Sequence, residues 1–323
     1  MPEKLYKKKH LTSFQLIILG VAGVILLGTF LLMLPVSSLE RVPTPFHEAL
    51  FTATSAVCVT GLVVKDTGSY WSLTGQTIIL VLIQIGGLGV VTVAASVSLL
   101  SGKKISLMQR RTMQDAISAP KVGGIVRLTR FILKGTFLIE ATGAVLLLPA
   151  FLSDYGVKGI WLAVFHSISA FCNAGFDILG TATHTFSSLM RYSGSILVNV
   201  VIMLLIITGG IGFLTWDDIY TNKLNFKRYR MQSKIILMTT ACLILLPAVF
   251  FFSCDLKKMS TGKRLLAAIF QSVTTRTAGF NTINISKMSE TSKAVMILLM
   301  LIGGSPGSTA GGMKTTTFTV LIL

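Results

Sequence analysis

Long apolar runs alternate with short polar segments along almost the whole chain. A run of about 20 apolar residues is long enough to cross the roughly 30 Å hydrocarbon core of a bilayer as a helix. The basic stretch before the first run is not followed by a small-residue cleavage site, so we expect a retained span there. The predicted spans are residues 14–34, 77–100, 131–152, 196–214, 235–252 and a final run from residue 294. We expect Pro149 to break the third of them, because proline removes a backbone hydrogen-bond donor.

Three shorter apolar segments lie between the two spans of each pair, at residues 46–57, 159–172 and 262–275. A helix of twelve residues rises about 18 Å, which is roughly half of the hydrocarbon core. Each segment must therefore dip into the membrane and return to the side from which it came. For the first segment, Thr44 is expected to be the N-cap and Pro45 the first helical residue.

The three short helices run into a common sequence pattern. Each pattern begins at an aromatic residue, continues through Ser, Thr and Ala, and ends in a small residue, a glycine and a bulky apolar residue. The stretches read FTATSAVCVTGL at residues 51–62, FHSISAFCNAGF at 165–176 and FQSVTTRTAGF at 270–280. A unit of span, half-helix and span that occurs three times is more specific than any single short motif.

The pattern predicts an all-α polytopic membrane protein, built from repeated units of span, re-entrant pore helix and span around a central pore. The first unit is expected over residues 1–102. The second, with the cytoplasmic loop before it, is expected over 103–222, and the third, with its loop and a broken inner helix, over 223–323. Composition agrees, because 52% of the residues are hydrophobic and 13% are charged, and the mean hydropathy is +0.75. No separate soluble domain is expected.

The formal net charge is +17, and the Lys and Arg residues fall in the loops between spans. Cytoplasmic loops of membrane proteins carry an excess of these residues, so topology explains the charge and nucleic acid is not an expected partner. The basic loops at residues 101–130 and 223–234 are therefore expected in the cytoplasm. Four lysines before the first span place the N-terminus there as well, namely Lys4, Lys7, Lys8 and Lys9.

A glycine-containing loop after a half-length helix is what an ion-selectivity filter requires. Backbone carbonyls must replace the water around a dehydrated cation, and glycine adopts backbone dihedrals that are closed to other residues. The half-helices aim their partly negative C-terminal ends at the membrane centre. No carboxylate lies in the three patterns, which favours a weakly hydrated monovalent ion such as K⁺. The expected filter residues, whose backbone carbonyls would hold K⁺, are Val59, Thr60, Gly61, Asn173, Ala174, Gly175, Thr277, Ala278 and Gly279.

Four motifs carry a resemblance to a known family: CVTGL at residues 58–62, FCNAGF at 171–176, TTRTAGFN at 274–281 and GGSPGSTAGGMKTTT at 303–317. Over essentially its whole length the chain resembles the membrane subunit of the Ktr/Trk/HKT superfamily of potassium transporters, and is most similar to the bacterial Ktr subunit. The resemblance implies a K⁺-channel-like, pseudo-fourfold pore in the cell membrane, with K⁺ as the main ion and a possible dependence on Na⁺. It also implies a homodimer on a cytoplasmic, nucleotide-binding regulatory ring of the RCK type.

Two features bear on that resemblance. The family has four repeats, whereas this sequence holds three and stops inside an apolar run, so we expect a fragment or a shortened chain that lacks the fourth repeat. In the family, a serine at the glycine position of the first filter goes with Na⁺ transport, and Gly61 therefore favours K⁺. A Na⁺-preferring or nonselective pore of the same architecture is the alternative.

The final apolar run cannot be one regular helix, because Pro306 and five glycines interrupt it at residues 303–312. Counted from Thr291, the break begins about 18 Å along a helix, near the middle of the membrane and just below the filter. The resemblance implies that such an intramembrane loop is the gate, and the alternative is a kink that eases packing. The expected gate residues are Gly303, Gly304, Ser305, Pro306, Gly307, Ser308, Thr309, Ala310, Gly311, Gly312 and Lys314.

The same loop contains G-x-S-x-G, which marks a nucleophile only on a strand-to-helix turn with a catalytic triad. Here it lies in an apolar helical run, and His166 is the histidine expected at membrane depth. An intramembrane serine hydrolase with Ser305 as nucleophile is therefore an alternative from a different functional class. The prediction remains a transporter and not an enzyme.

Several other residues allow two interpretations. The glycine pairs 86–87 and 209–210 are expected to allow close helix packing. Glu140 lies inside a span, where a carboxylate suggests a function, although pairing with Lys134 or with a polar group on a neighbouring helix is preferred. Arg276 would either bond to filter carbonyls or repel cations. The acidic pair at 217–218 is expected to be a solvated helix end.

Overall fold

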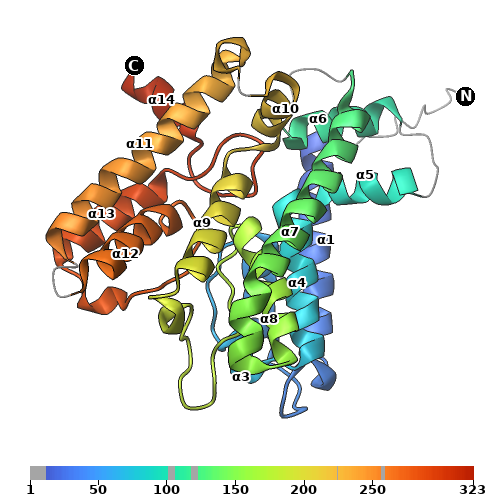
Figure 1. The fold of residues 1–323 in the computed structure, drawn as a ribbon. Coiled ribbons are helices and arrows are strands. Elements are labelled where there is room, and N and C mark those ends of the chain that lie inside the picture. The colour runs from blue at the N-terminus through green and yellow to red at the C-terminus, as the bar shows by residue number, and fades with distance from the viewer. Residues whose placement is uncertain (1–11, 101–105, 118–122, 224, 256–258) are drawn as a thin grey trace, which may run out of the picture.

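The computed structural model describes residues 12–100, 106–117, 123–223, 225–255 and 259–323 (Figure 1). Within these ranges the chain is helical, and its only β structure is two isolated bridges. The all-α class is therefore confirmed. The lysines that bear on the N-terminal orientation, Lys4, Lys7, Lys8 and Lys9, lie outside the described residues, as do parts of the first basic loop at 101–105 and 118–122.

The first unit contains the predicted span and the predicted half-helix. Its helices are α1 (Ser13–Met33), α2 (Phe46–Val57), the short α3 (Thr67–Tyr70), α4 (Leu73–Leu88) and α5 (Val90–Leu100). The start of α2 differs from the prediction, because Pro45 occupies the N-cap position and no side chain caps the helix. The hydroxyl of Thr44 instead forms a 3.1 Å hydrogen bond with the hydroxyl of Tyr70.

The second unit follows the same order after a helix in the first basic loop. Its helices are α6 (Leu107–Ile117), α7 (Ile125–Tyr155), α8 (Lys158–Phe171), α9 (Ile196–Gly210) and α10 (Phe213–Asn222). The prediction that Pro149 breaks the span was wrong, because α7 continues through this proline. Membrane helices tolerate an internal proline where neighbouring groups or a local adjustment accommodate the freed backbone carbonyl.

The third unit is the most irregular. Its helices are α11 (Met231–Cys254), α12 (Thr261–Thr274), α13 (Glu290–Leu301) and α14 (Thr315–Ile322). Pro247 lies inside α11 without ending it. The predicted break in the final run is confirmed, since α13 and α14 are separated by a non-helical segment that includes the 303–312 loop.

Two predicted spans are not single helices. The runs 77–100 and 196–214 were each expected to cross the membrane unbroken, and this was wrong: α4 meets α5, and α9 meets α10, at a bend of 98°. The bends lie at Gly89, with φ of 82°, and at Gly212, with φ of 88°. A helical residue needs φ near −63°, so the helix must stop at each of these glycines.

The apolar helices identify a membrane protein. Among the described residues, α1, α7 and α11 are long and apolar enough to cross a bilayer alone, and each bent pair passes the same test as one broken span. On α1, large apolar side chains such as Phe14, Ile18 and Leu27 are exposed, which is the surface a helix presents to lipid.

Each outer span packs along the half-helix of its own unit: α1 on α2, α7 on α8 and α11 on α12. The units join where α4 packs on α8 and where α9 packs on α12. As a result α9 lies centrally in Figure 1, with the third unit on its left and the other helices of the first two units on its right. Fully buried aromatic side chains fill the interior around the half-helices, including Phe165, Phe171, Phe176, Phe270 and Phe280.

Candidate ion pathway

The three loops that follow the half-helices share one backbone conformation. In each loop a non-glycine residue with positive φ is followed, two positions later, by a glycine with positive φ. The φ angles are 55° and 79° at Val59 and Gly61, 56° and 68° at Asn173 and Gly175, and 63° and 84° at Thr277 and Gly279. Left-handed backbone is uncommon for non-glycine residues, so its recurrence at equivalent positions indicates a shared structural requirement.

The N–H groups of these loops point back at the half-helices. The Thr60 N–H donates to the Ser55 carbonyl and the Ala174 N–H to the Ser169 carbonyl, both at 2.8 Å. In the third loop the Ala278 N–H donates to a carbonyl of α12, at 3.0 Å. The carbonyls of the same loops stay free: in the described part of the chain, no backbone or side-chain donor bonds to any carbonyl oxygen of residues 59–61, 173–175 or 277–279.

Successive loops meet at their glycines. A Cβ atom at Gly61 would fall on the carbonyl oxygen of Ala174 in the second loop. A Cβ atom at Gly175 would lie 2.5 Å from the carbonyl oxygen of Ala278 in the third loop, and 2.9 Å from the Cα atom of Gly279. The structure therefore brings all three predicted loops together, and only glycine fits at these two contacts.

A second set of close backbone contacts lies between the glycine pairs of the inner helices and the ends of the half-helices. A Cβ atom at Gly86 of α4 would fall on the carbonyl oxygen of Val57, the last residue of α2. One at Gly209 of α9 would fall on the carbonyl oxygen of Phe171, the last residue of α8. The predicted packing role of these glycines is confirmed, and it holds the ends of the first two half-helices in place.

The 303–312 loop lies against both the second and third candidate filter loops and the bend between α9 and α10. The two ends of the loop are joined by the Gly303 N–H, which donates to the Met313 carbonyl at 3.0 Å. The Ser305 N–H donates to the Gly210 carbonyl at 2.9 Å, and the Phe213 N–H at the start of α10 donates to the Gly307 carbonyl at 2.8 Å. The loop tip thus rests on the inner helix of the second unit.

The polar side chains of this loop are mostly bonded. The Ser305 and Thr315 hydroxyls form a 3.1 Å hydrogen bond, and the Lys314 ammonium donates to the Ala310 carbonyl at 2.8 Å. The Ser308 hydroxyl is buried and has no partner among the described residues. The loop is therefore held in place by individual hydrogen bonds and not by helical structure.

Comparison with known proteins places this arrangement in a family. Residues 3–323 match the family described as TrkH, cation transport protein. The chain belongs to this family. Its members are transporters, so the serine hydrolase alternative no longer applies to Ser305.

Two relatives of this TrkH-family chain extend the match. It is 40% identical to the potassium/sodium uptake protein NtpJ of Enterococcus hirae, over 98% of this chain and 70% of that protein. It is 38% identical to the Ktr system potassium uptake protein B of Bacillus subtilis, over 99% of this chain and 72% of that protein.

The fold matches a solved structure of the same family. The chain superposes on the potassium transporter TrkH from Vibrio parahaemolyticus with a TM-score of 0.72 at 18% sequence identity. The match covers 100% of this chain and 63% of that one, so the chain spans less than two thirds of the solved transporter.

Polar groups behind the candidate filter of this TrkH-family chain follow some predictions and not others. Glu140 accepts hydrogen bonds from the Gln84 side-chain amide on α4 at 3.0 and 3.2 Å, so the predicted pairing with a neighbouring helix is confirmed. Arg276 is buried, and its Nε and Nη2 atoms have no partner among the described residues. Of the two alternatives for Arg276, bonding to carbonyls of the candidate filter is therefore not made by these two atoms.

The acidic pair after the second inner helix differs from the prediction. Asp218 was expected to be solvated, but this was wrong, because it is only 2% exposed. Its carboxylate accepts from the Arg230 backbone N–H at 2.8 Å and from the Asn222 amide at 2.7 Å. Arg230 is the N-cap residue of α11, so Asp218 fixes the start of the next span. Asp217 instead forms an exposed ion pair with Arg230.

Two carboxylates in the segments that follow the first and second candidate filter loops were not singled out from the sequence. Asp66 is buried and accepts from the Phe186 backbone N–H at 2.7 Å. Asp177 follows Gly175 of the second candidate filter loop by two residues and accepts from the Leu179 N–H at 3.3 Å. Burial raises the pKa of Asp177 to about 6, and the nearby charge of Asp66 adds to this. Its place just after the glycine was the available sequence signal.

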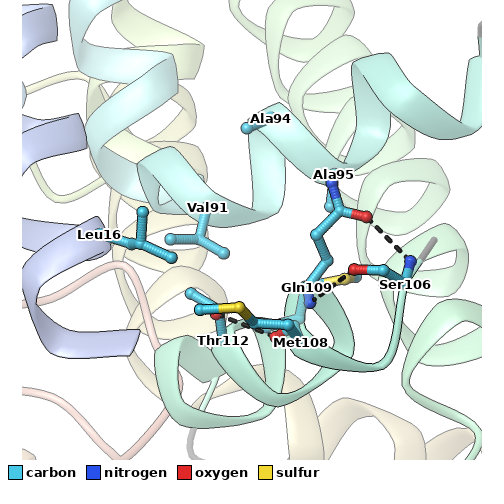
Figure 2. A pocket seen from close by; sticks show the side chains of 9 residues that line it. Leu16, Val91, Ala94, Ala95, Ser106, Met108, Gln109 and Thr112 are labelled. Carbon is cyan, nitrogen blue, oxygen red and sulfur yellow. Dashed lines mark hydrogen bonds between the residues drawn. The ribbon is translucent and has the colours of Figure 1, made fainter. Parts of the chain in front are cut away.

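A hollow of about 440 Å³ lies between α1, α5 and α6 (Figure 2). Leu16, Val91 and Met108 contribute apolar side chains to it. Ser106 and Gln109 exchange hydrogen bonds at the start of α6, at 2.9 and 3.2 Å, which caps this helix. None of the residues that line the hollow belongs to the three filter loops or to the 303–312 loop.

Proposed function

We propose that this chain conducts K⁺ into the cell through the three loops described above. The single observation that carries the proposal is the set of backbone carbonyls at residues 59–61, 173–175 and 277–279, which accept no hydrogen bond in the described part of the chain. Carbonyl oxygens without protein donors are what a dehydrated cation needs in place of its water. The three units, at residues 1–102, 103–222 and 223–323, each supply one such loop.

The chemistry of the loops favours a weakly hydrated monovalent cation. The half-helices α2, α8 and α12 end at the loops, and their C-terminal ends carry partial negative charge. No carboxylate occurs in the filter residues themselves, whereas divalent cations prefer charged oxygen ligands. The carbonyl dipoles attract a cation without holding it too tightly to leave, which conduction requires.

A Na⁺-preferring or nonselective pore is the second candidate. The observation in its favour is that one relative is named a potassium/sodium uptake protein. We favour K⁺ because Gly61 stands where the family resemblance associates serine with Na⁺ transport. A dependence of K⁺ uptake on Na⁺ is compatible with both candidates.

We propose that the 303–312 loop, together with Lys314, acts as the gate. The loop bonds to the inner helix of the second unit and to the start of α10, so its displacement would open space below the filter. The Lys314 ammonium places a positive charge beside the loop, held by the Ala310 carbonyl.

We also propose a homodimer in the cell membrane, with the N-terminus in the cytoplasm and a cytoplasmic regulatory ring of the RCK type as partner. Exposed Arg110 and Arg111 on α6 support a docking role for the first basic loop. The relatives named as Ktr system proteins support the assignment to a multi-component uptake system.

The test is growth of a bacterium that lacks K⁺ uptake, at low K⁺, after expression of the protein at its full natural length. Uptake of Rb⁺ and Na⁺ is measured alongside. We expect rescue and faster Rb⁺ than Na⁺ uptake. Gly61→Ser, Gly175→Ser and Gly279→Ser should each lower the Rb⁺ to Na⁺ ratio, because a Cβ atom disturbs the positive-φ backbone. The matched control is Gly23→Ser on α1, where an added Cβ atom meets nothing within 4 Å.

A further inference from the structure

The non-glycine residues with positive φ in the filter loops need outside support. Val59, Asn173 and Thr277 all have left-handed backbone. Asparagine tolerates this conformation, but for a β-branched residue such as valine or threonine it is an outlier. Backbone of this kind persists only where the surrounding structure holds it in place.

At Asn173 the support comes from the 303–312 loop. The Asn173 side-chain amide donates to the Thr309 hydroxyl at 2.9 Å, and that hydroxyl donates to the Phe171 carbonyl at 2.9 Å. The Thr309 backbone N–H donates to the Gly209 carbonyl at 3.2 Å. Asn173 is 1% exposed and Thr309 is 6% exposed, so water does not compete for these bonds.

The third filter loop is held by the same segment at its equivalent residue. The Thr277 hydroxyl accepts a hydrogen bond from the Gly311 N–H at 3.2 Å. The first loop has valine at this position, which offers no side-chain hydrogen-bonding atom. The 303–312 loop thus contacts the left-handed residue of two filter loops, through two of its own residues that are two positions apart.

We infer that Thr309 is a positioning residue for ion selectivity, which couples the 303–312 loop to the second filter loop through Asn173. This inference rests on the proposed function and deepens it. The loop then helps to fix the positions of the filter carbonyls, so a displacement of the loop also changes those positions. Gating and selectivity share these contacts and are not independent properties of this chain.

The hydroxyl of Thr309 is central because it accepts and donates at the same time. Valine has nearly the same shape but can do neither, so Thr309→Val leaves the Asn173 amide and the Phe171 carbonyl without this partner. A single hydrogen bond between neutral groups changes an equilibrium by roughly fivefold. We therefore expect Thr309→Val to lower the Rb⁺ to Na⁺ uptake ratio by about fivefold.

The experiment measures Rb⁺ and Na⁺ uptake by liposomes that contain the purified full-length protein. Thr309→Ser retains the hydroxyl and should keep the wild-type ratio. The matched control is Thr208→Val on α9, whose hydroxyl bonds, among the described residues, only to carbonyls of its own helix at 2.8 and 3.0 Å. A general loss of folded protein lowers both fluxes and leaves their ratio unchanged, whereas a relaxed filter changes the ratio.

Thr277→Val is a second, independent variant, since it removes the contact with Gly311 in the third loop. It should also lower the Rb⁺ to Na⁺ uptake ratio. If Thr309→Val does not fold, this variant still tests whether the 303–312 loop supports the candidate filter. Unchanged ratios in the folded variants, with K⁺ transport by the wild type, would overturn this inference alone. A wild-type protein that transports neither ion would overturn the proposed function and this inference with it.

Discussion

At the scale of single residues, the glycines of the inner helices set how closely the half-helices approach. Gly209 lies against the Phe171 carbonyl and beside the Thr309 hydroxyl, which leaves no room for a methyl group. Elsewhere in a helix, alanine is preferred to glycine because it restricts the unfolded chain. The presence of glycine here therefore reflects packing and not helix formation.

We expect Gly209→Ala to lower the free energy of unfolding by about 1–3 kcal/mol, which is typical of an overpacked interior. Thermal unfolding of the detergent-solubilised protein measures this. Gly23→Ala on α1 is the control, because a Cβ atom there meets nothing within 4 Å. It should be neutral or slightly stabilising. Equal melting temperatures for the two variants would contradict the packing argument.

Asp177 predicts a pH dependence of stability. Its pKa is raised to about 6, mainly by burial, so the folded protein disfavours the charged carboxylate. The cost to stability is nearly absent at low pH, grows as the pH rises toward 6, and is complete above it. Asp177→Asn cannot ionise and should be more stable than the wild type at neutral pH, by up to about 3 kcal/mol. At acidic pH, below the ordinary carboxyl pKa, the two should be equal.

Thermal unfolding at roughly pH 3 and at roughly pH 7.5 tests this, with the exposed Glu40→Gln as a control for a lost surface charge. A stability difference for Asp177→Asn that is the same at both pH values would show that burial of the carboxylate is not its cause.

At the scale of elements, one carboxylate joins two spans. Asp218 of α10 accepts from the backbone N–H of Arg230, immediately before α11. Asp218→Ala leaves that N–H without its acceptor, and we expect a loss of about 1–3 kcal/mol in the free energy of unfolding. The neighbouring Asp217→Ala removes only an exposed ion pair and should cost less than about 1 kcal/mol. Chemical denaturation of both variants measures the difference, and similar losses would refute the capping role of Asp218.

The elements differ in how far the sequence predicts them. The half-helices were predicted to within one residue of their observed ends, because a strong turn pattern follows each one. The bends at Gly89 and Gly212 were missed, since the apolar run continues on both sides of each glycine. Hydrophobicity reports burial or lipid contact but not the φ angle of a single residue. The same limit applied to Asp218, because its partner is a backbone N–H twelve residues away.

The shared conformation of the three candidate filter loops was predictable because their sequence pattern recurs three times, whereas the contacts that hold these loops were not. Asn173 and Thr309 are 136 positions apart, and neither belongs to a motif that points to the other. Pairings of this kind depend on how the units pack together, which no local pattern records.

At the scale of the whole molecule, the charge distribution predicts where the proposed regulatory ring would dock. Arg110 and Arg111 are exposed on α6. We expect replacement of both by Gln to weaken binding of the regulatory ring by about tenfold at low salt, because two peripheral charge pairs are lost. Lys287→Gln lies in the loop before α13, on the opposite side of the proposed membrane, and is the control. Biolayer interferometry on the immobilised protein should show no effect for Lys287→Gln. Equal binding by all variants would exclude docking through α6.

The two bends of 98° have an electrical consequence. In Figure 1, α5 runs away from the centre of the molecule, so α4 and α5 do not form one straight helix across the membrane. A transmembrane potential falls mainly across the part of a pathway that water does not fill, and each charge that crosses about 100 mV gains about 2.3 kcal/mol. On the proposed pathway, the candidate filter loops are such a part, because their carbonyls would replace the water around the ion, so the ion would gain electrical energy there.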